Sequence, residues 1–162
     1  MICYRKATLE DLNRVWDYQM QLNPDDPRMQ RWRDNYISRN IHNRAATYVA
    51  VNGGEPVGEV TLDYYAEAYG NPDIRPKLAD GKDTAYVTAL RVRSAFEGNG
   101  YISSLMRYME TEAREMGFSQ LVIGVEATET KSLAIYLHWG YNQFVISDVD
   151  CSELVLFYAK NL

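Results

Sequence analysis

Apolar and polar positions follow the clearest pattern between Tyr86 and Gln143, and this stretch predicts two strands and two helices. The segment at its start, TAYVTALRVRSAF, alternates over short distances and is rich in β-branched and aromatic residues, as expected of a strand. A helix with one apolar face follows, because apolar residues recur at intervals of three and four: Ile102, Leu105, Met106, Met109, Ala113 and Met116. A second short strand over Leu121 to Val125 and a second helix over Ser132 to Trp139 complete the pattern.

The turn Glu97-Gly98-Asn99-Gly100 separates the first strand from the first helix. A glycine turn that opens a helix presents free backbone N–H groups and the positive end of the helix dipole, which suits an anion such as a phosphate. The same residues also fit a plain strand-to-helix turn. The turn is not a Walker loop, because no Lys-Ser/Thr pair follows its second glycine, and it lacks the third glycine of a dinucleotide fingerprint.

The first third of the chain predicts one strand and two helices. Ile2 to Ala7 reads as a strand, and Thr8 is a good N-cap for the first helix, with Asp11 completing a variant of the capping box. The second helix starts after Asp25-Asp26-Pro27. Its exposed positions carry arginines, which form either a solvated basic face or a contact to an acidic substrate or to cofactor phosphates: Arg28, Arg31, Arg33, Arg39 and Arg44.

Two hairpins are also predicted. Ala46 to Val51 and Pro56 to Tyr65 are strands joined by Asn52-Gly53-Gly54-Glu55. Phe144 to Val149 and Glu153 to Ala159 form a terminal hairpin. Residues 66–83 have no clear periodicity and predict a long surface loop, a length that is more often functional than accidental.

Composition and charge narrow the class of protein. The 162 residues suit one domain, residues 1–162, with a self-sufficient core. A net charge of -5 argues against general binding to nucleic acid, and no apolar run is long enough to span a membrane. We expect a cytoplasmic protein, because the start lacks the apolar segment of a signal peptide, and Cys3 and Cys151 give no disulfide framework. The isolated His42 and His138 predict no metal site.

Taken one at a time, the residues that could take part in catalysis also have ordinary structural explanations. Tyr136 is one of thirteen tyrosines and reads as a core or boundary aromatic residue, and His138 is a weak candidate for a base. No serine or cysteine fits a nucleophile elbow, so a covalent hydrolase is not indicated. Glu59 and Asp63 alternate on one strand and are more typical of solvent-facing positions than of general bases.

In combination, these segments resemble the GNAT superfamily of N-acetyltransferases over about the last half of the chain. In that family a Val-x-Pro-like strand end leads to Gln/Arg-x-x-Gly-x-Gly/Ala, matched here by Val92-Arg93-Ser94 and then by Glu97 to Ile102. A later helix carries Asn-x-x-Ala/Ser-x-x-x-Tyr-x-x-x-Gly-Phe/Tyr, matched by residues 129–141 with Tyr136 and Gly140. The order of strand, two helices and hairpin in the first half also fits the family.

Three positions depart from the family pattern. Glu97 replaces Gln/Arg, Ile102 replaces the second small residue and Glu129 replaces asparagine. A carboxylate beside a pyrophosphate is repulsive unless it points away, and a β-branched residue hinders close approach of the backbone. Sliding the register by two aligns Gly98 and Gly100 with both family glycines, but it places Ser103 where the helix needs its first buried leucine. The first register is therefore preferred.

The resemblance implies a single mixed α/β domain, with a mostly antiparallel central sheet flanked by helices. It also implies an acyltransferase that moves an acetyl group from acetyl-CoA to a primary amine of a small molecule or protein, without a metal. The residues it assigns to the cofactor are Leu90, Arg91, Val92, Glu97, Gly98, Asn99, Gly100, Tyr101, Ile102, Ser103, Glu129 and Ser132. By the same resemblance, Tyr136 would protonate the leaving sulfur. No motif identifies the general base, for which Glu59 and Tyr86 are candidates.

Two other functions stay open on the sequence. The altered phosphate loop, with Glu97 and Ile102, would suit a non-catalytic CoA-binding or sensing domain, although Tyr136 argues against it. A protein-interaction module has only the acidic net charge in its favour. Neither the acceptor amine nor the formation of a homodimer follows from any motif.

Overall fold

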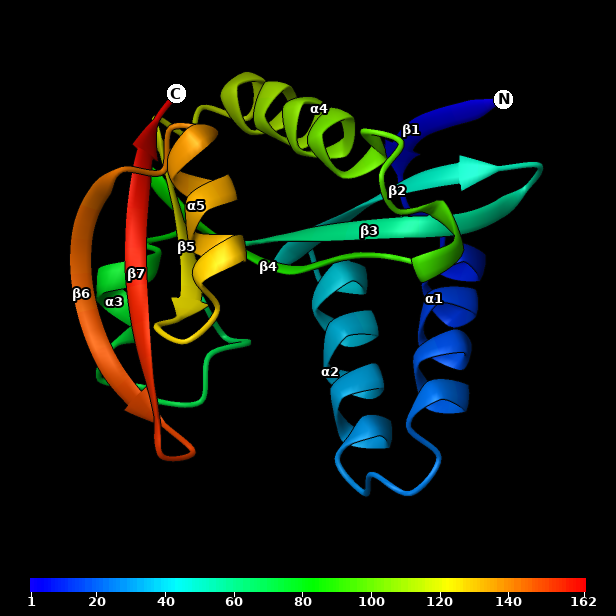
Figure 1. Cartoon of the computed structure of the whole chain (residues 1–162), viewed down its shortest axis with the longest axis horizontal. Helices are drawn as coiled ribbons and strands as arrows, with labels where there is room; N and C mark the ends of the chain where they lie inside the picture. Colours follow the sequence, from blue (N-terminus) through cyan, green and yellow to red (C-terminus); the bar gives the residue numbers. More distant parts are fainter. The chain divides into compact units, whose positions relative to one another are not determined.

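The computed structural model describes all 162 residues and contains one seven-stranded, mixed sheet in the order β1-β2-β3-β4-β5-β7-β6 (Figure 1). β1 pairs antiparallel with β2, β4 pairs parallel with β5, and β7 pairs antiparallel with both β5 and β6. The strands are β1 (Ile2–Lys6), β2 (Ala45–Asn52), β3 (Glu55–Asp63), β4 (Thr84–Val92), β5 (Gln120–Glu126), β6 (Gln143–Asp150) and β7 (Glu153–Asn161). The helices are α1 (Leu9–Leu22), α2 (Met29–Ile41), α3 (Arg75–Leu78), the 3-10 turn η1 (Ser94–Phe96), α4 (Tyr101–Glu115) and α5 (Thr130–His138).

The chain forms two compact units that share β3, β4 and α4. The first unit comprises residues 1–61 and 89–111, and the second comprises residues 62–88 and 112–162. The elements predicted from the sequence are present in both units, with shifts of a few residues at their ends.

In the first unit, the start of α1 is fixed by the predicted capping box. The backbone N–H of Asp11 donates to Thr8 Oγ1 at 3.1 Å, and that of Thr8 donates to Asp11 Oδ2 at 2.8 Å. Figure 1 shows α1 and α2 side by side. Trp16 and Val15 of α1 pack with Met29 and the valines of β2, and the Trp16 and Tyr36 ring centroids lie 5.2 Å apart. This packing holds α1 in place relative to the strands of this unit.

In the second unit, the predicted surface loop contains a short helix and contributes a few buried side chains to the core. Residues 66–83 include the short helix α3, and Ala66, Tyr69 and Leu78 are buried. The Tyr69 ring packs edge-on against Phe157 of β7, with centroids 5.1 Å apart. Its hydroxyl donates a 2.6 Å hydrogen bond to Asp148 of β6. Most of the segment is exposed or partly buried, as expected of a surface connection, but the burial of Ala66, Tyr69 and Leu78 was not predicted, because these residues follow no helical or strand periodicity.

No helix in the structure combines the length and the apolar character that crossing a lipid bilayer requires.

Candidate active site

The glycine turn has the geometry of an anion-binding helix start. Gly98 and Gly100 have φ angles of +76° and +75°, which favour glycine, and a Cβ atom at either would meet nothing within 4 Å. The Asn99 side-chain amide donates to the carbonyl oxygens of Phe96 and Glu97, at 3.2 Å each, and so holds the turn. The N–H of Ser104 donates to Gly100 O at 3.1 Å, so the N–H groups of the first turn before it have no intrahelical acceptor. The turn therefore combines unpaired backbone N–H donors with open space beside its two glycines.

Glu97 and Ile102, two of the three departures from the family pattern, differ in where their side chains lie. Glu97 is exposed, and its carboxylate makes no ion pair. Ile102 lines a small apolar hollow toward the sheet, together with Gly58 of β3 and Leu105 of α4. Glycine at position 58 leaves room there, because a Cβ atom would lie 3.3 Å from the carbonyl oxygen of Arg91. Ile102 and Gly58 thus line the same small hollow, which the missing side chain at position 58 leaves open.

The strand that leads to the turn is irregular at Ala89. Its φ angle is +53°, which is uncommon for a non-glycine residue and is often found at functional sites. The half-buried residues Leu90, Arg91 and Val92 follow it. The N–H of Arg93 then donates to Val57 O at 2.8 Å, so β4 is again held by β3 just before the turn.

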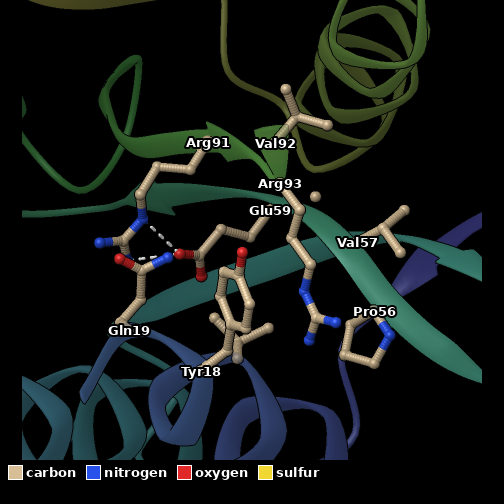
Figure 2. A pocket seen from close by; sticks show the side chains of 10 residues that line it. Tyr18, Gln19, Pro56, Val57, Glu59, Arg91, Val92 and Arg93 are labelled. Atoms are coloured by element: carbon tan, nitrogen blue, oxygen red, sulfur yellow. Dashed lines mark hydrogen bonds and ion pairs between the residues drawn. The ribbon is translucent and has the colours of Figure 1, made fainter. Parts of the chain in front are cut away.

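Glu59 of β3 is buried and paired, not solvent-facing as its strand position suggested. Its side chain is 4% exposed, and Arg91 Nε donates to its Oε1 at 2.6 Å (Figure 2). Burial raises the pKa of the Glu59 carboxyl, and the charge of Arg91 partly opposes that rise. The second oxygen, Oε2, accepts no hydrogen bond in the protein. A buried carboxylate with one free oxygen can accept a proton or bind an ammonium group.

Glu59 lies at a hollow that sequence reasoning did not identify. Figure 2 shows Tyr18 and Gln19 of α1 pointing toward Glu59 and Arg91, with Arg93 beside them. The hollow measures about 20 Å³ and shares Tyr18 and Arg93 with a second, wider one of about 250 Å³. We call the two together the α1 groove; its lining residues are Arg14, Val15, Asp17, Tyr18, Gln19, Gln21, Glu55, Pro56, Val57, Gly58, Glu59, Arg91, Val92 and Arg93. No local signal marks the α1 residues, because they face the groove only through the packing of α1.

Tyr136 belongs to the second unit, on α5, together with Glu129 and Ser132. Its side chain is half-buried, and its ring centroid lies 5.8 Å from that of Trp139. Burial, and after it the charge of Glu129, raises the pKa of Tyr136 above its ordinary value of 10.0, so the phenol is protonated at neutral pH. The hydroxyl has no hydrogen-bond partner in the protein, which leaves its proton available.

Tyr86, the other candidate for a general base, and Asp63 are buried in the second unit. Tyr86 packs in the core, with its ring centroid 6.2 Å from that of Phe157. Asp63 is fully buried and accepts a 2.8 Å hydrogen bond from the N–H of Ala68, so it is not the solvent-facing residue that the strand pattern suggested. Of the three residues, Glu59 lines the hollow beside α1.

Comparison with proteins of known structure shows that this fold is shared with several acetyltransferases. An N-acetyltransferase from Staphylococcus aureus Mu50 is 17% identical, with 99% of this chain and 98% of that chain covered and a TM-score of 0.69. A ribosomal-protein-alanine N-acetyltransferase from Brucella melitensis is 18% identical, with 99% of each chain covered and a TM-score of 0.71. The PaiA N-acetyltransferase from Thermoplasma acidophilum, in complex with coenzyme A, is 16% identical, with coverage of 100% and 99% and a TM-score of 0.66.

A search of curated protein sequences finds no match for this chain. The family model described as "Acetyltransferase (GNAT) family" matches residues 8–141, which include the glycine turn, Glu59 and Tyr136. The mixed sheet with its flanking helices agrees with that match. The chain therefore belongs to the GNAT family of acetyltransferases.

Proposed function

We propose that this protein transfers an acetyl group from acetyl-CoA to a primary amine. The observation that carries the proposal is the glycine turn at the start of α4, where free N–H groups face open space beside Gly98 and Gly100. Family membership and the coenzyme A in the Thermoplasma acidophilum structure support this use of the turn.

The residues that would hold the cofactor fall into three groups. The N–H groups from Gly98 to Ser103 would bind the pyrophosphate, and the backbone of Leu90 to Val92, after the irregular Ala89, would pair with the pantetheine arm. Glu129 and Ser132 on α5 are further candidates. Acetyl-CoA supplies a thioester, whose acetyl group passes to the amine nitrogen as the C–N bond forms and the C–S bond breaks.

Two side chains would handle the protons of this transfer. An alkyl amine with a pKa of about 10.4 must lose a proton before its lone pair can attack. Glu59 would accept that proton through Oε2, and its burial makes it a stronger base than an exposed glutamate. Tyr136 would give a proton to the departing sulfur, whose thiol has a pKa of about 8.5. Its phenol holds that proton at neutral pH, because burial raises its pKa.

A CoA-binding or sensing domain without catalysis is the alternative function. The exposed carboxylate of Glu97 beside the turn favours it, since a nearby negative charge opposes the pyrophosphate. Tyr136 argues for catalysis, because its phenol is protonated at neutral pH, as a proton donor to the leaving sulfur must be.

Release of free CoA thiol from acetyl-CoA, measured across a panel of primary amines, tests the proposal. Amine-dependent release is expected from the wild-type protein. A rise of melting temperature with CoA, but no release with any amine, would select the sensing domain instead.

A further inference from the structure

We propose that the acceptor amine carries a carboxylate, and that Arg93 binds this carboxylate in the α1 groove and thereby determines specificity. The inference rests on the proposed acetyl transfer and adds to it the chemical class of the acceptor. Arg93 follows β4 directly and lines both hollows of the groove (Figure 2).

Arg93 has only a distant carboxylate partner in the groove, and it shares that carboxylate with another arginine. The carboxylates that line the groove make their closest contacts with other arginines: Glu59 with Arg91, Glu55 with Arg14 at 3.0 Å, and Asp17 with Arg33. The nearest carboxylate oxygen to Arg93 is Glu55 Oε2, at 3.6 Å, which is too long for a hydrogen bond. Arg93 thus forms a long ion pair with Glu55 but no side-chain hydrogen bond to the protein, so its N–H donors can still hydrogen-bond to a ligand.

The Arg93 guanidinium is nevertheless held in place. Its Cζ lies 4.0 Å from the centroid of the Tyr18 ring, and the side chain is only 23% exposed. Stacking on an aromatic face fixes the plane of the guanidinium and leaves its edge free. A planar fork of donors matches a carboxylate, which can accept two parallel hydrogen bonds from it.

The other polar groups of the groove favour an amino acid over a phosphate ester. Glu59 and Arg93 line the same hollow, so a ligand with both an ammonium and a carboxylate group would meet opposite charges at both ends. A phosphate dianion would instead lie near the carboxylates of Glu55 and Glu59, which disfavour it by like-charge repulsion. Val15, Pro56 and Val57 provide apolar walls for the carbon skeleton.

Binding measured by calorimetry, in the presence of CoA, tests the inference independently of turnover. The probes are a panel of α-, β- and ω-amino acids, each paired with its own amide, together with β-alanine paired with phosphoethanolamine. For the best ligand, we expect the acid to bind at least roughly 10-fold more tightly than its amide, as for a hydrogen-bonded charge pair. We also expect β-alanine to bind more tightly than phosphoethanolamine.

Arg93→Met should bind the acid and its amide with about equal affinity. Arg93→Lys should keep part of the preference for the acid, since lysine retains the positive charge but lacks the planar pair of donors of arginine. Arg107→Met is the matched control: it removes the same charge from an exposed α4 residue outside the groove and should keep the full preference. The CoA-induced rise in melting temperature should be unchanged in all three variants.

Several results would overturn the inference. These are no preference for any acid over its amide in the wild type, an unchanged preference in Arg93→Met, or a preference for phosphoethanolamine. Its failure is distinguishable from failure of the proposed function. Acetylation of amines with no carboxylate preference would remove only the inference, whereas carboxylate-dependent binding without acetylation of any amine would remove the enzymatic function.

Discussion

Arg91 donates a 2.6 Å hydrogen bond from Nε to Oε1 of Glu59, and this contact joins β4 to β3 beneath α1. The arginine is held from its other side by Trp16, whose ring centroid lies 5.1 Å from the Arg91 Cζ. Glu59 is therefore a buried carboxylate with one paired oxygen and one free oxygen. Such an arrangement can hold the free oxygen in place for an incoming amine.

Removing Arg91 should destabilise the protein in a pH-dependent way. Arg91→Met leaves a buried carboxylate unpaired, which we expect to cost near the lower end of about 3–5 kcal/mol, because the Arg91 side chain is itself 34% exposed. Burial raises the Glu59 pKa above its ordinary 4.5, so the stability linked to Glu59 is present below that value and lost as pH rises through the folded-state pKa. Arg91→Met raises this pKa further, so its cost should grow with pH.

Urea unfolding of the variant across the range from about pH 5 to pH 8 measures this effect. Glu59→Gln in the Arg91→Met background is the control, since a neutral side chain should remove the pH dependence and recover part of the stability. A cost of Arg91→Met that is the same at both ends of the range would contradict the assignment.

Ile102 and Gly58 should behave as a coupled pair. Gly58→Val places a Cβ atom 3.3 Å from Arg91 O and fills the hollow that Ile102 lines, an overpacking that we expect to cost about 1–3 kcal/mol. Adding Ile102→Ala should recover part of that loss, giving a favourable coupling energy in a double-mutant cycle. Gly70→Ala, where a Cβ atom meets nothing within 4 Å, should have little effect. Additive losses would show that the two residues do not share this space.

These contacts show where sequence reasoning succeeds and where it ends. The helix from Tyr101 to Glu115 and its glycine turn could be predicted because apolar spacing and glycine conformation act over a few residues. The burial of Glu59 and the part played by Tyr18 could not be predicted, because they depend on α1 packing against strands about forty residues away. The burial of Leu78 was missed for the same reason, since its partners in the core are distant in sequence.

CoA binding at the glycine turn should depend on the charge of a side chain introduced at position 100 more than on its size. Asparagine and aspartate tolerate the +75° φ of Gly100 better than other side chains do, and space is open there, so both variants should fold. Gly100→Asp should abolish the rise in melting temperature that CoA causes, because its carboxylate would repel the pyrophosphate. Gly100→Asn, of nearly the same size, should keep most of that rise. Equal responses of the two variants would mean that no phosphate binds at this turn.

Tyr136→Phe should lower kcat without affecting stability. Phenylalanine keeps the ring and its contact with Trp139, and the lost hydroxyl has no hydrogen-bond partner in the protein. Loss of a general acid typically costs about 10²–10⁴ in rate, and we expect at least a roughly ten-fold decrease in kcat with CoA affinity unchanged. Tyr158→Phe, a half-buried tyrosine on β7, is the matched control and should retain full activity. A Tyr136→Phe enzyme with the wild-type rate would exclude Tyr136 as the proton donor.

The most direct test of the central claim is mass spectrometry of the amines after incubation with isotopically labelled acetyl-CoA and the wild-type protein. We predict that at least one primary amine gains a single labelled acetyl group on nitrogen. We also predict an equal amount of free CoA, and loss of both products in Glu59→Gln combined with Tyr136→Phe. Tight binding of CoA with no labelled product from any amine would contradict the claim that this protein is an acetyltransferase.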